Sequence, residues 1–140
     1  MMFRGRYEFL SNFYYAPFVE DGIEYPTVEH FFQAQKTFDE GDRKLIASAS
    51  TPGLAKRMGR RVSLRKDWDS ARIDVMEAGL RAKFSDPFLK NKLVQTYPLE
   101  IVEDNSWKDY FWGRCNGRGS NHLGRLLMKI RGEVMEDTSL

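Results

Sequence analysis

The chain is poor in the residues that make disulfides and metal sites. It has one cysteine, Cys115, and two histidines, His30 and His122, among 140 residues. A lone cysteine excludes an internal disulfide and suits a reducing compartment. The histidines lie far apart, and no cysteine or histidine group has the spacing of metal ligands. We therefore expect neither a metal nor another cofactor.

Long apolar runs are also missing. No stretch approaches the roughly 20 apolar residues of a membrane-spanning helix, and the opening Met1-Met2-Phe3-Arg4 lacks the apolar core of a signal peptide. The sequence therefore predicts a cytoplasmic protein without a membrane partner. Net charge is only +2, which argues against binding nucleic acid through bulk charge alone.

Aromatic and charged residues are plentiful. Charged residues make up 30% of the chain and aromatic residues 14%, including ten Phe, six Tyr and three Trp. This composition and length predict one globular domain over residues 1–140, with aromatic side chains to spare for a ligand pocket. The residues from 56 to 66 hold a basic cluster with no acid in it, which is either a solvated face or an edge that approaches a polyanion. Its members are Lys56, Arg57, Arg60, Arg61, Arg65 and Lys66.

Helix and turn signals predict a mainly helical α+β domain with a small sheet. Asp21-Gly22 between short apolar runs predicts a β-hairpin. A helix is expected from about Val28 to Phe38, ended by Gly41, with Asp42 capping the next helix.

Further helices are expected after Thr51-Pro52, near Asp67 or Asp69, after Asp86-Pro87, and after Ser120 or Asn121. Alternation predicts a strand over residues 98–103, with a second strand over 107–112.

One stripe of the first long helix carries the residues best suited to chemistry. With Thr27 as the N-cap, Glu29, Gln33 and Lys36 fall on one line beside an aromatic face. A partly buried glutamate can act as general acid or base, and a desolvated lysine can attack a carbonyl to form a Schiff base. The alternative is the solvated polar face of an ordinary amphipathic helix.

A second candidate lies between tryptophans. Asp109 stands between Trp107 and Trp112, a pattern typical of a subsite that stacks a flat ring. Glu29 and Asp109 would then form a carboxylate pair for cleaving a glycosidic bond. The alternative is a turn aspartate beside core tryptophans.

Three weaker signals complete the candidate site. Glycines before the last helix, with Arg118, Gly119 and Asn121, can hold a phosphate or a ribose hydroxyl, or simply cap the helix. Ser11, Asn12 and Phe13 can line a pocket rim. Trp68 is either a hydrophobic staple or a ring-stacking wall.

Taken in order, several motifs resemble one known family. They are Leu10-Ser11-Asn12-Phe13-Tyr14, the stretch Tyr25-Pro26-Thr27-Val28-Glu29-His30-Phe31-Phe32-Gln33-Ala34-Gln35-Lys36, Trp68-Asp69, Trp112-Gly113, and Asn121-His122-Leu123-Gly124-Arg125-Leu126-Leu127-Met128-Lys129-Ile130-Arg131. Together they resemble the NADAR, or YbiA-like, family over nearly the whole chain. The resemblance implies the YbiA-like fold and no metal.

That resemblance implies an N-glycosidase, a hydrolase that cleaves ribose from a base nitrogen. Its implied substrates are ADP-ribose on guanine in DNA, whose removal reverses ADP-ribosylation, or phosphoribosylaminopyrimidine intermediates of riboflavin biosynthesis. It places a functional glutamate at Glu29 and a lysine at Lys36. It also implies pocket roles for Trp68, Asp109, Trp112 and Asn121.

Our sequence-based hypothesis is removal of ADP-ribose through a Lys36 imine, with Glu29 moving protons. Direct hydrolysis, with Glu29 or Asp109 activating water, is the mechanistic alternative. A module that binds ADP-ribose or nucleotides without turnover, or a nucleic-acid-binding protein built on the basic cluster, are the functional alternatives. The sequence gives no oligomeric state.

Overall fold

The computed structural model describes residues 1–138, which form two compact units. Residues 12–83 form one, here called the middle unit, and residues 1–11 with 84 onward form the other, the terminal unit. The fold is mainly helical with two very small sheets, as the sequence predicted. Among the described residues no helix is both long enough and apolar enough to cross a membrane.

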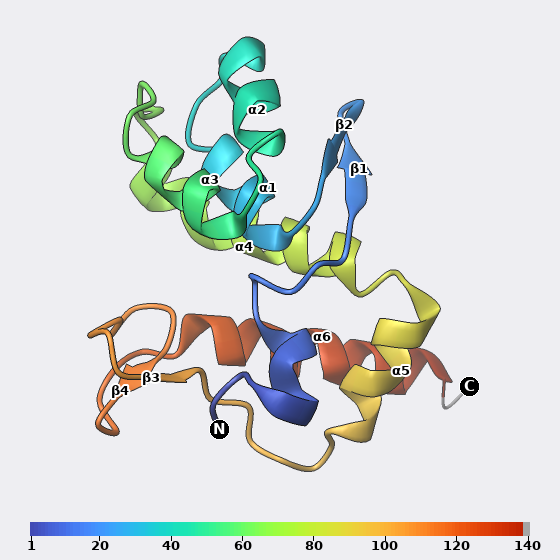
Figure 1. Cartoon of the computed structure of the whole chain (residues 1–140). Helices are drawn as coiled ribbons and strands as arrows, with labels where there is room; N and C mark the ends of the chain where they lie inside the picture. The colour runs from blue at the N-terminus through green and yellow to red at the C-terminus, as the bar shows by residue number, and fades with distance from the viewer. Residues whose placement is uncertain (139–140) are drawn as a thin grey trace. The chain divides into compact units, whose positions relative to one another are not determined.

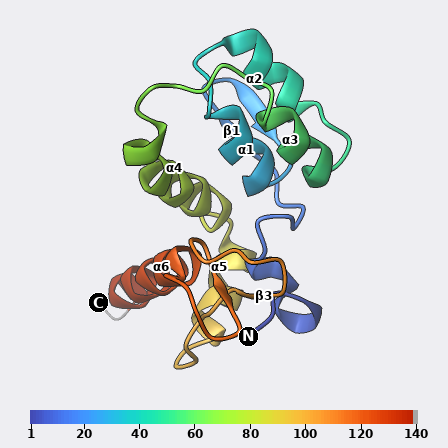
Figure 2. The same cartoon turned by 90° about the vertical axis from the view of Figure 1, so that its left-hand side faces the viewer.

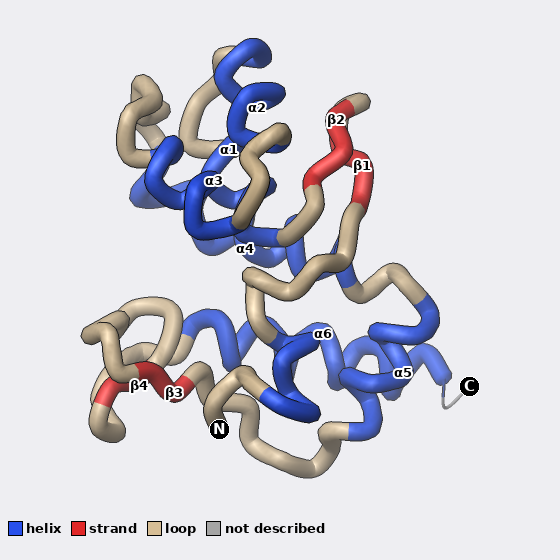
Figure 3. The backbone as a smooth tube through the Cα atoms, in the orientation of Figure 1, coloured by secondary structure: helices blue, strands red, loops and turns tan. Residues whose placement is uncertain are grey.

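The middle unit begins with a hairpin of β1 (Phe18–Glu20) and β2 (Ile23–Tyr25), shown in red in Figure 3. Asp21 and Gly22 between them both have positive φ, at 51° and 77°. Two positive φ values match the turn whose twist suits a two-residue hairpin loop. The predicted hairpin is therefore confirmed, with the expected turn chemistry.

Four helices follow in this unit: α1 (Val28–Ala34), α2 (Glu40–Ala47), α3 (Pro52–Gly59) and α4 (Trp68–Lys83). Their core includes Tyr25 and Phe31, whose rings meet edge to face with centroids 5.3 Å apart. The helix α4 approaches α1 closely because Gly79 has no side chain; a Cβ there would lie 2.9 Å from the Phe31 ring.

Two helix boundaries in the middle unit differ from the prediction. Asp39, not Asp42, caps α2, accepting from the Asp42 N–H at 2.8 Å, and Gly41 lies inside the first turn of that helix. The helix α1 ends at Ala34 instead of Phe38. The carbonyl of Lys36 accepts a hydrogen bond from the backbone N–H of Arg65 at 2.8 Å instead of from a residue one turn later in a helix.

The terminal unit contains a 3-10 helix η1 (Gly5–Leu10), α5 (Pro87–Gln95), the parallel pair β3 (Asp104–Asn105) and β4 (Arg114–Cys115), and α6 (His122–Thr138). The expected helix start at Asp86-Pro87 is confirmed, since Asp86 accepts from the Leu89 N–H at 2.9 Å.

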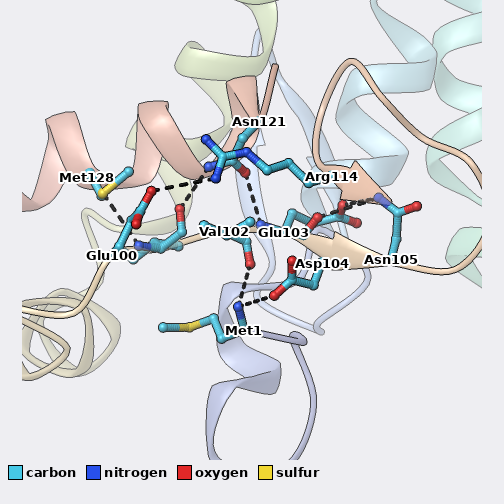
Figure 4. A network of polar contacts seen from close by, with 10 residues as sticks. Met1, Glu100, Val102, Glu103, Asp104, Asn105, Arg114, Asn121 and Met128 are labelled. Carbon is cyan, nitrogen blue, oxygen red and sulfur yellow. Dashed lines mark hydrogen bonds and ion pairs between the residues drawn. The ribbon is translucent and has the colours of Figure 1, made fainter. Parts of the chain in front are cut away.

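The two strands predicted over residues 98–103 and 107–112 are wrong: the strands found nearby are the short β3 and β4. In the first segment, side chains take the backbone groups that a strand partner would use. The side chain of Asn121 accepts from the Glu103 N–H and donates to the Ile101 carbonyl, both at 3.0 Å (Figure 4). The alternating sequence pattern of residues 98–103 therefore does not correspond to a strand.

Candidate active site

The helix α1 is fixed at its start by a buried threonine–histidine pair. The Thr27 hydroxyl oxygen accepts from the His30 N–H at 3.2 Å, which confirms the predicted N-cap. His30 Nε2 lies 3.0 Å from the Ala49 carbonyl, and its Nδ1 lies 2.8 Å from the Thr27 hydroxyl. Because a carbonyl only accepts, Nε2 carries the proton and Nδ1 accepts from the hydroxyl. His30 therefore ties α1 to the segment before α3.

Glu29 is the buried acid of this helix, with 8% of its surface exposed. Gln33, one turn later, donates Nε2 to its Oε1 at 2.8 Å. Burial raises the pKa of the Glu29 carboxyl, outweighing the Gln33 hydrogen bond and the positive charges of Lys56 and Lys36, which lower it. A carboxyl in this setting holds its proton to a higher pH than usual, as a general acid requires.

Lys36 lies in the turn directly after α1 and is half-buried. Its N–H donates to the Gln33 carbonyl at 3.2 Å, which holds the turn against the end of the helix. Burial lowers the pKa of the Lys36 amine, and the charges of Arg60 and Lys56 act in the same direction, against the opposing effect of Glu29. More of this amine is therefore neutral, and nucleophilic, than in a solvated lysine.

Arg65 anchors the turn that carries Lys36, a role the sequence did not reveal. Its guanidinium makes two bonds to the Asp67 carboxylate, at 2.6 and 2.8 Å, and lies 4.3 Å from the centre of the Phe38 ring. Its backbone N–H then meets the Lys36 carbonyl. The sequence marked Arg65 only as part of the basic cluster, because a contact across 29 positions leaves no local signal.

Two buried side-chain oxygens in this region, Asn12 Oδ1 and Gln33 Oε1, have no hydrogen-bond partner among the residues that the structure describes. Asn12 is joined to the acid, since its carbonyl accepts the Glu29 N–H at 3.1 Å. The Gln33 side chain is joined to Glu29 through the hydrogen bond from Gln33 Nε2 to Glu29 Oε1. Buried acceptors without donors are rare and costly in folded proteins. Their place beside Glu29 is typical of a site whose polar groups meet a ligand.

The amide of Gln33 lies against Gly59 of α3, in the space that the side chain of any other residue would fill. A Cβ on Gly59 would lie 2.0 Å from Gln33 Oε1. Figures 1 and 2 both show α3 beside α1 in the middle unit.

Trp68 and Phe13, the other predicted residues of the middle unit, have different surroundings. Trp68 is buried at the start of α4, with its ring centroid 5.0 Å from that of Phe32. This packing is that of a core residue. Phe13 keeps 46% of its surface exposed. The pocket roles of both residues stay predictions.

Asp109 lies in the terminal unit, in a tight turn. Its Oδ1 accepts the backbone N–H groups of Phe111 and Trp112 at 3.1 and 2.9 Å, and its own N–H donates to Asn105 at 3.1 Å. These bonds give Asp109 a turn-closing role. Trp112 is half-buried and packs edge to face on Phe111, with centroids 4.7 Å apart. Catalysis by Asp109 and stacking by Trp112 stay predictions.

The glycine-rich loop before α6 is held by its own backbone. The N–H groups of residues 120–123 donate to carbonyls of residues 110–113, at 2.8 to 3.3 Å. These N–H groups are already used, so a phosphate here would depend on Arg118, which is exposed. Gly119 has a φ of 136° and no room for a Cβ, which would lie 2.3 Å from the Gly113 carbonyl.

Asn121 is the buried residue that precedes α6, and its amide bridges to Ile101 and Glu103. Ser11, also in the terminal unit, follows η1 and donates its N–H to the Glu8 carbonyl at 2.9 Å. The structure thus gives both residues local structural contacts, and their binding roles stay predictions.

The middle unit brings four of the predicted residues into one hydrogen-bonded or electrostatically coupled cluster: Asn12, Glu29, Gln33 and Lys36. The proposed carboxylate pair of Glu29 and Asp109 takes one member from each unit. That pair therefore stays a prediction as well.

The chain is similar in sequence to known enzymes. The chain is 45% identical over 128 residues to the N-glycosidase YbiA of Shigella flexneri serotype 5b, covering 89% of this chain and 79% of the relative. It is 37% identical over 132 residues to a riboflavin biosynthesis protein of Vibrio vulnificus, covering 91% of this chain and 36% of that protein. These relatives place it among hydrolases that act on N-glycosyl compounds, as the sequence predicted.

The family model described as "NADAR domain" matches residues 2–135 of the chain. The chain belongs to the NADAR family. The NMR structure of the E. coli protein YbiA superposes with a TM-score of 0.86 and 40% sequence identity, covering 99% of this chain and 86% of that one. The resemblance inferred from the motifs, and the YbiA-like fold it implied, are both confirmed.

Proposed function

We propose that this protein is an N-glycosidase that removes ADP-ribose from guanine in modified nucleic acid. The observation that carries the chemistry is the pairing of Glu29 with Lys36, whose pKa values burial moves toward each other. At the usual values of 4.5 and 10.5, a protonated glutamate beside a neutral lysine would be present in only about one molecule in a million. Each shift raises that fraction.

The reaction needs that protonation state. Glu29 donates a proton to the ring oxygen as the lone pair of the base nitrogen opens the ribose to a C1=N imine. The neutral Lys36 amine then adds to C1, and the base amine leaves with the proton that lysine gives up. Water adds to the resulting lysine imine, the C–N bond to lysine breaks, and the free sugar is released. One water is consumed, and Glu29 recovers its proton.

The basic cluster supports a polyanionic substrate. Its residues belong to the same unit as Glu29 and Lys36. A phosphodiester chain beside the target base would be attracted by such an edge, whereas a small metabolite needs fewer cations.

A second candidate substrate is the set of phosphoribosylaminopyrimidine intermediates of riboflavin biosynthesis. The observation that favours it is the identity to the Vibrio vulnificus protein, whose name places it in that pathway. The same Glu29–Lys36 chemistry would apply, because both substrates carry ribose on a base nitrogen.

Trapping with borohydride tests the mechanism. Borohydride added during turnover should reduce the imine and leave the sugar attached to Lys36, located by peptide mass. Lys36→Ala should lose the adduct and nearly all activity. Lys44→Ala is the matched control, since Lys44 is an exposed lysine of the same unit, 3.3 Å from Glu40. Full activity in Lys36→Ala, with no adduct in the wild type, would favour direct hydrolysis.

The substrate and the binding-module alternative are tested with purified substrates. Incubation with each substrate class and mass identification of the released sugar separates ADP-ribose from ribose 5-phosphate. Glu29→Gln should abolish release while substrate affinity stays within a few fold of wild type. A wild-type protein that binds both classes and releases no sugar would be a binding module.

A further inference from the structure

The helix α3 packs its backbone directly against the catalytic stretch of α1. Ala55 is fully buried, and Gly59, one turn later, leaves the space that Gln33 Oε1 fills. The two small residues form a close seam between the helices, on the side of α1 that carries Glu29 and Gln33. The residues at the edge of that seam therefore lie next to the proposed reaction centre.

Lys56 and Arg60 each follow one of the seam residues. They are four positions apart, so they stand on the same side of α3, one above the other. Both are exposed. Gly59, directly before Arg60, lies against Gln33, the Lys56 charge acts on both Glu29 and Lys36, and the Arg60 charge acts on Lys36, so both basic groups lie near the segment that carries Glu29 and Lys36.

The result is a local excess of positive charge. The charges of Lys36 and Lys56 act on Glu29 and that of Arg60 acts on Lys36, and among the described residues none of these three basic groups lies within 4.0 Å of a carboxylate oxygen. Lys56 and Arg60 are like charges close to an acid that tends to stay neutral, so a bound anion would stabilise them. Arginine and lysine are the side chains that bind phosphate best.

We propose that Lys56 and Arg60 of α3 form the phosphate subsite of this centre, binding the phosphate on the ribose O5 while Lys36 reaches the anomeric carbon. This inference rests on the proposed function. Its ligand chemistry, a phosphate ester of ribose, is common to both candidate substrates. Under this proposal, two residues of the basic cluster contact the substrate phosphate and the other four do not.

Calorimetric titration of the full chain with ribose 5-phosphate, ADP-ribose and ribose tests the subsite. We expect ribose 5-phosphate to bind at least ten times more tightly than ribose. Lys56→Ala and Arg60→Ala should each weaken binding of the phosphorylated sugar about tenfold, the equivalent of about 1.4 kcal/mol, with binding of ribose unchanged. ADP-ribose carries the same phosphate on the ribose O5, so both substitutions should weaken its binding as well, and unchanged ADP-ribose affinity in both variants would overturn the subsite.

Arg57→Ala is the matched control. Arg57 is exposed on α3 beside Lys56 in sequence, and the helix turns it about 100° away. Its loss removes the same charge and should change binding less than twofold. Equal weakening by all three substitutions, or unchanged binding in Lys56→Ala and Arg60→Ala, would overturn the subsite.

The outcomes separate this inference from the proposed function. Imine trapping on Lys36 with no effect of the α3 variants on phosphate binding would overturn the subsite alone. Phosphate binding that depends on Lys56 and Arg60, without any sugar release, would support the subsite and overturn the catalytic proposal. Melting curves of the variants confirm that each protein is folded.

Discussion

Replacing Gly59 by alanine should damage both the stability and the acid chemistry of the site. The new Cβ would lie 2.0 Å from Gln33 Oε1 and 2.9 Å from its Cδ. Ordinary contact begins near about 3.5 Å, so the amide must move by roughly 1.5 Å. Both partners are buried, so the movement breaks the 2.8 Å hydrogen bond from Gln33 to Glu29.

The size of the effect follows from two costs and one gain. Overpacking a core costs about 1–3 kcal/mol, and a lost hydrogen bond to a carboxylate costs about 1.5–3 kcal/mol. Alanine gains at most about 1 kcal/mol over glycine in a helix, and less at the last helical residue. We expect Gly59→Ala to lower the free energy of unfolding by about 2–5 kcal/mol, measured by urea denaturation.

A second glycine of the same helix serves as the control. A Cβ on Gly53 would meet only Thr51 Oγ1, at an ordinary 3.9 Å, so Gly53→Ala should be neutral or slightly stabilising. In a Gln33→Ala background the contacts at 2.0 and 2.9 Å disappear and only the 3.1 Å contact with the Cβ of residue 33 remains, so Gly59→Ala should then cost much less. Since the Gln33 hydrogen bond lowers the pKa of Glu29, its loss should also move the Glu29 limb of the pH–rate profile upward. Equal stability of the two alanine variants, with an unchanged profile, would refute the packing argument.

Three further outcomes are expected. Burial raises the pKa of Glu29, so the folded protein binds this proton more tightly than the unfolded chain does. The stability that this proton contributes is lost as pH rises through the folded pKa. Urea denaturation should therefore show Glu29→Gln to be more stable than wild type at pH 8, with a smaller gain at pH 4. Thr27→Val should lose the cap of α1 and the His30 bond, lowering stability by about 1–2 kcal/mol, and a melting temperature equal to wild type would contradict this. Asn121→Ala should cost about 2–3 kcal/mol, because it removes two backbone partners at residues 101 and 103 and places alanine at a φ of 53°; hydrogen exchange should accelerate in that segment, and unchanged exchange would count against the bridging role.

Local signals predicted the parts of this fold that depend on neighbouring residues. Asp21-Gly22 gave the hairpin because its backbone needs positive φ, and Thr27 and Thr51 gave helix starts because their oxygens meet N–H groups three positions on. The NADAR motifs likewise identified the family and its class of enzyme. Helical spacing also predicted that Glu29 and Gln33 share one face of α1, whereas Lys36 lies in the turn after that helix.

Tertiary contacts decided the rest. The segment 98–103 alternates like a strand, but Asn121 takes its backbone groups. The end of α1 is set by Arg65, and the position of the Gln33 amide by Gly59. Burial of Glu29, which raises its pKa, likewise arises from chain segments that spacing along one helix cannot reveal. Sequence periodicity fixes which residues share a face, whereas the protonation and geometry of a site depend on what packs against that face.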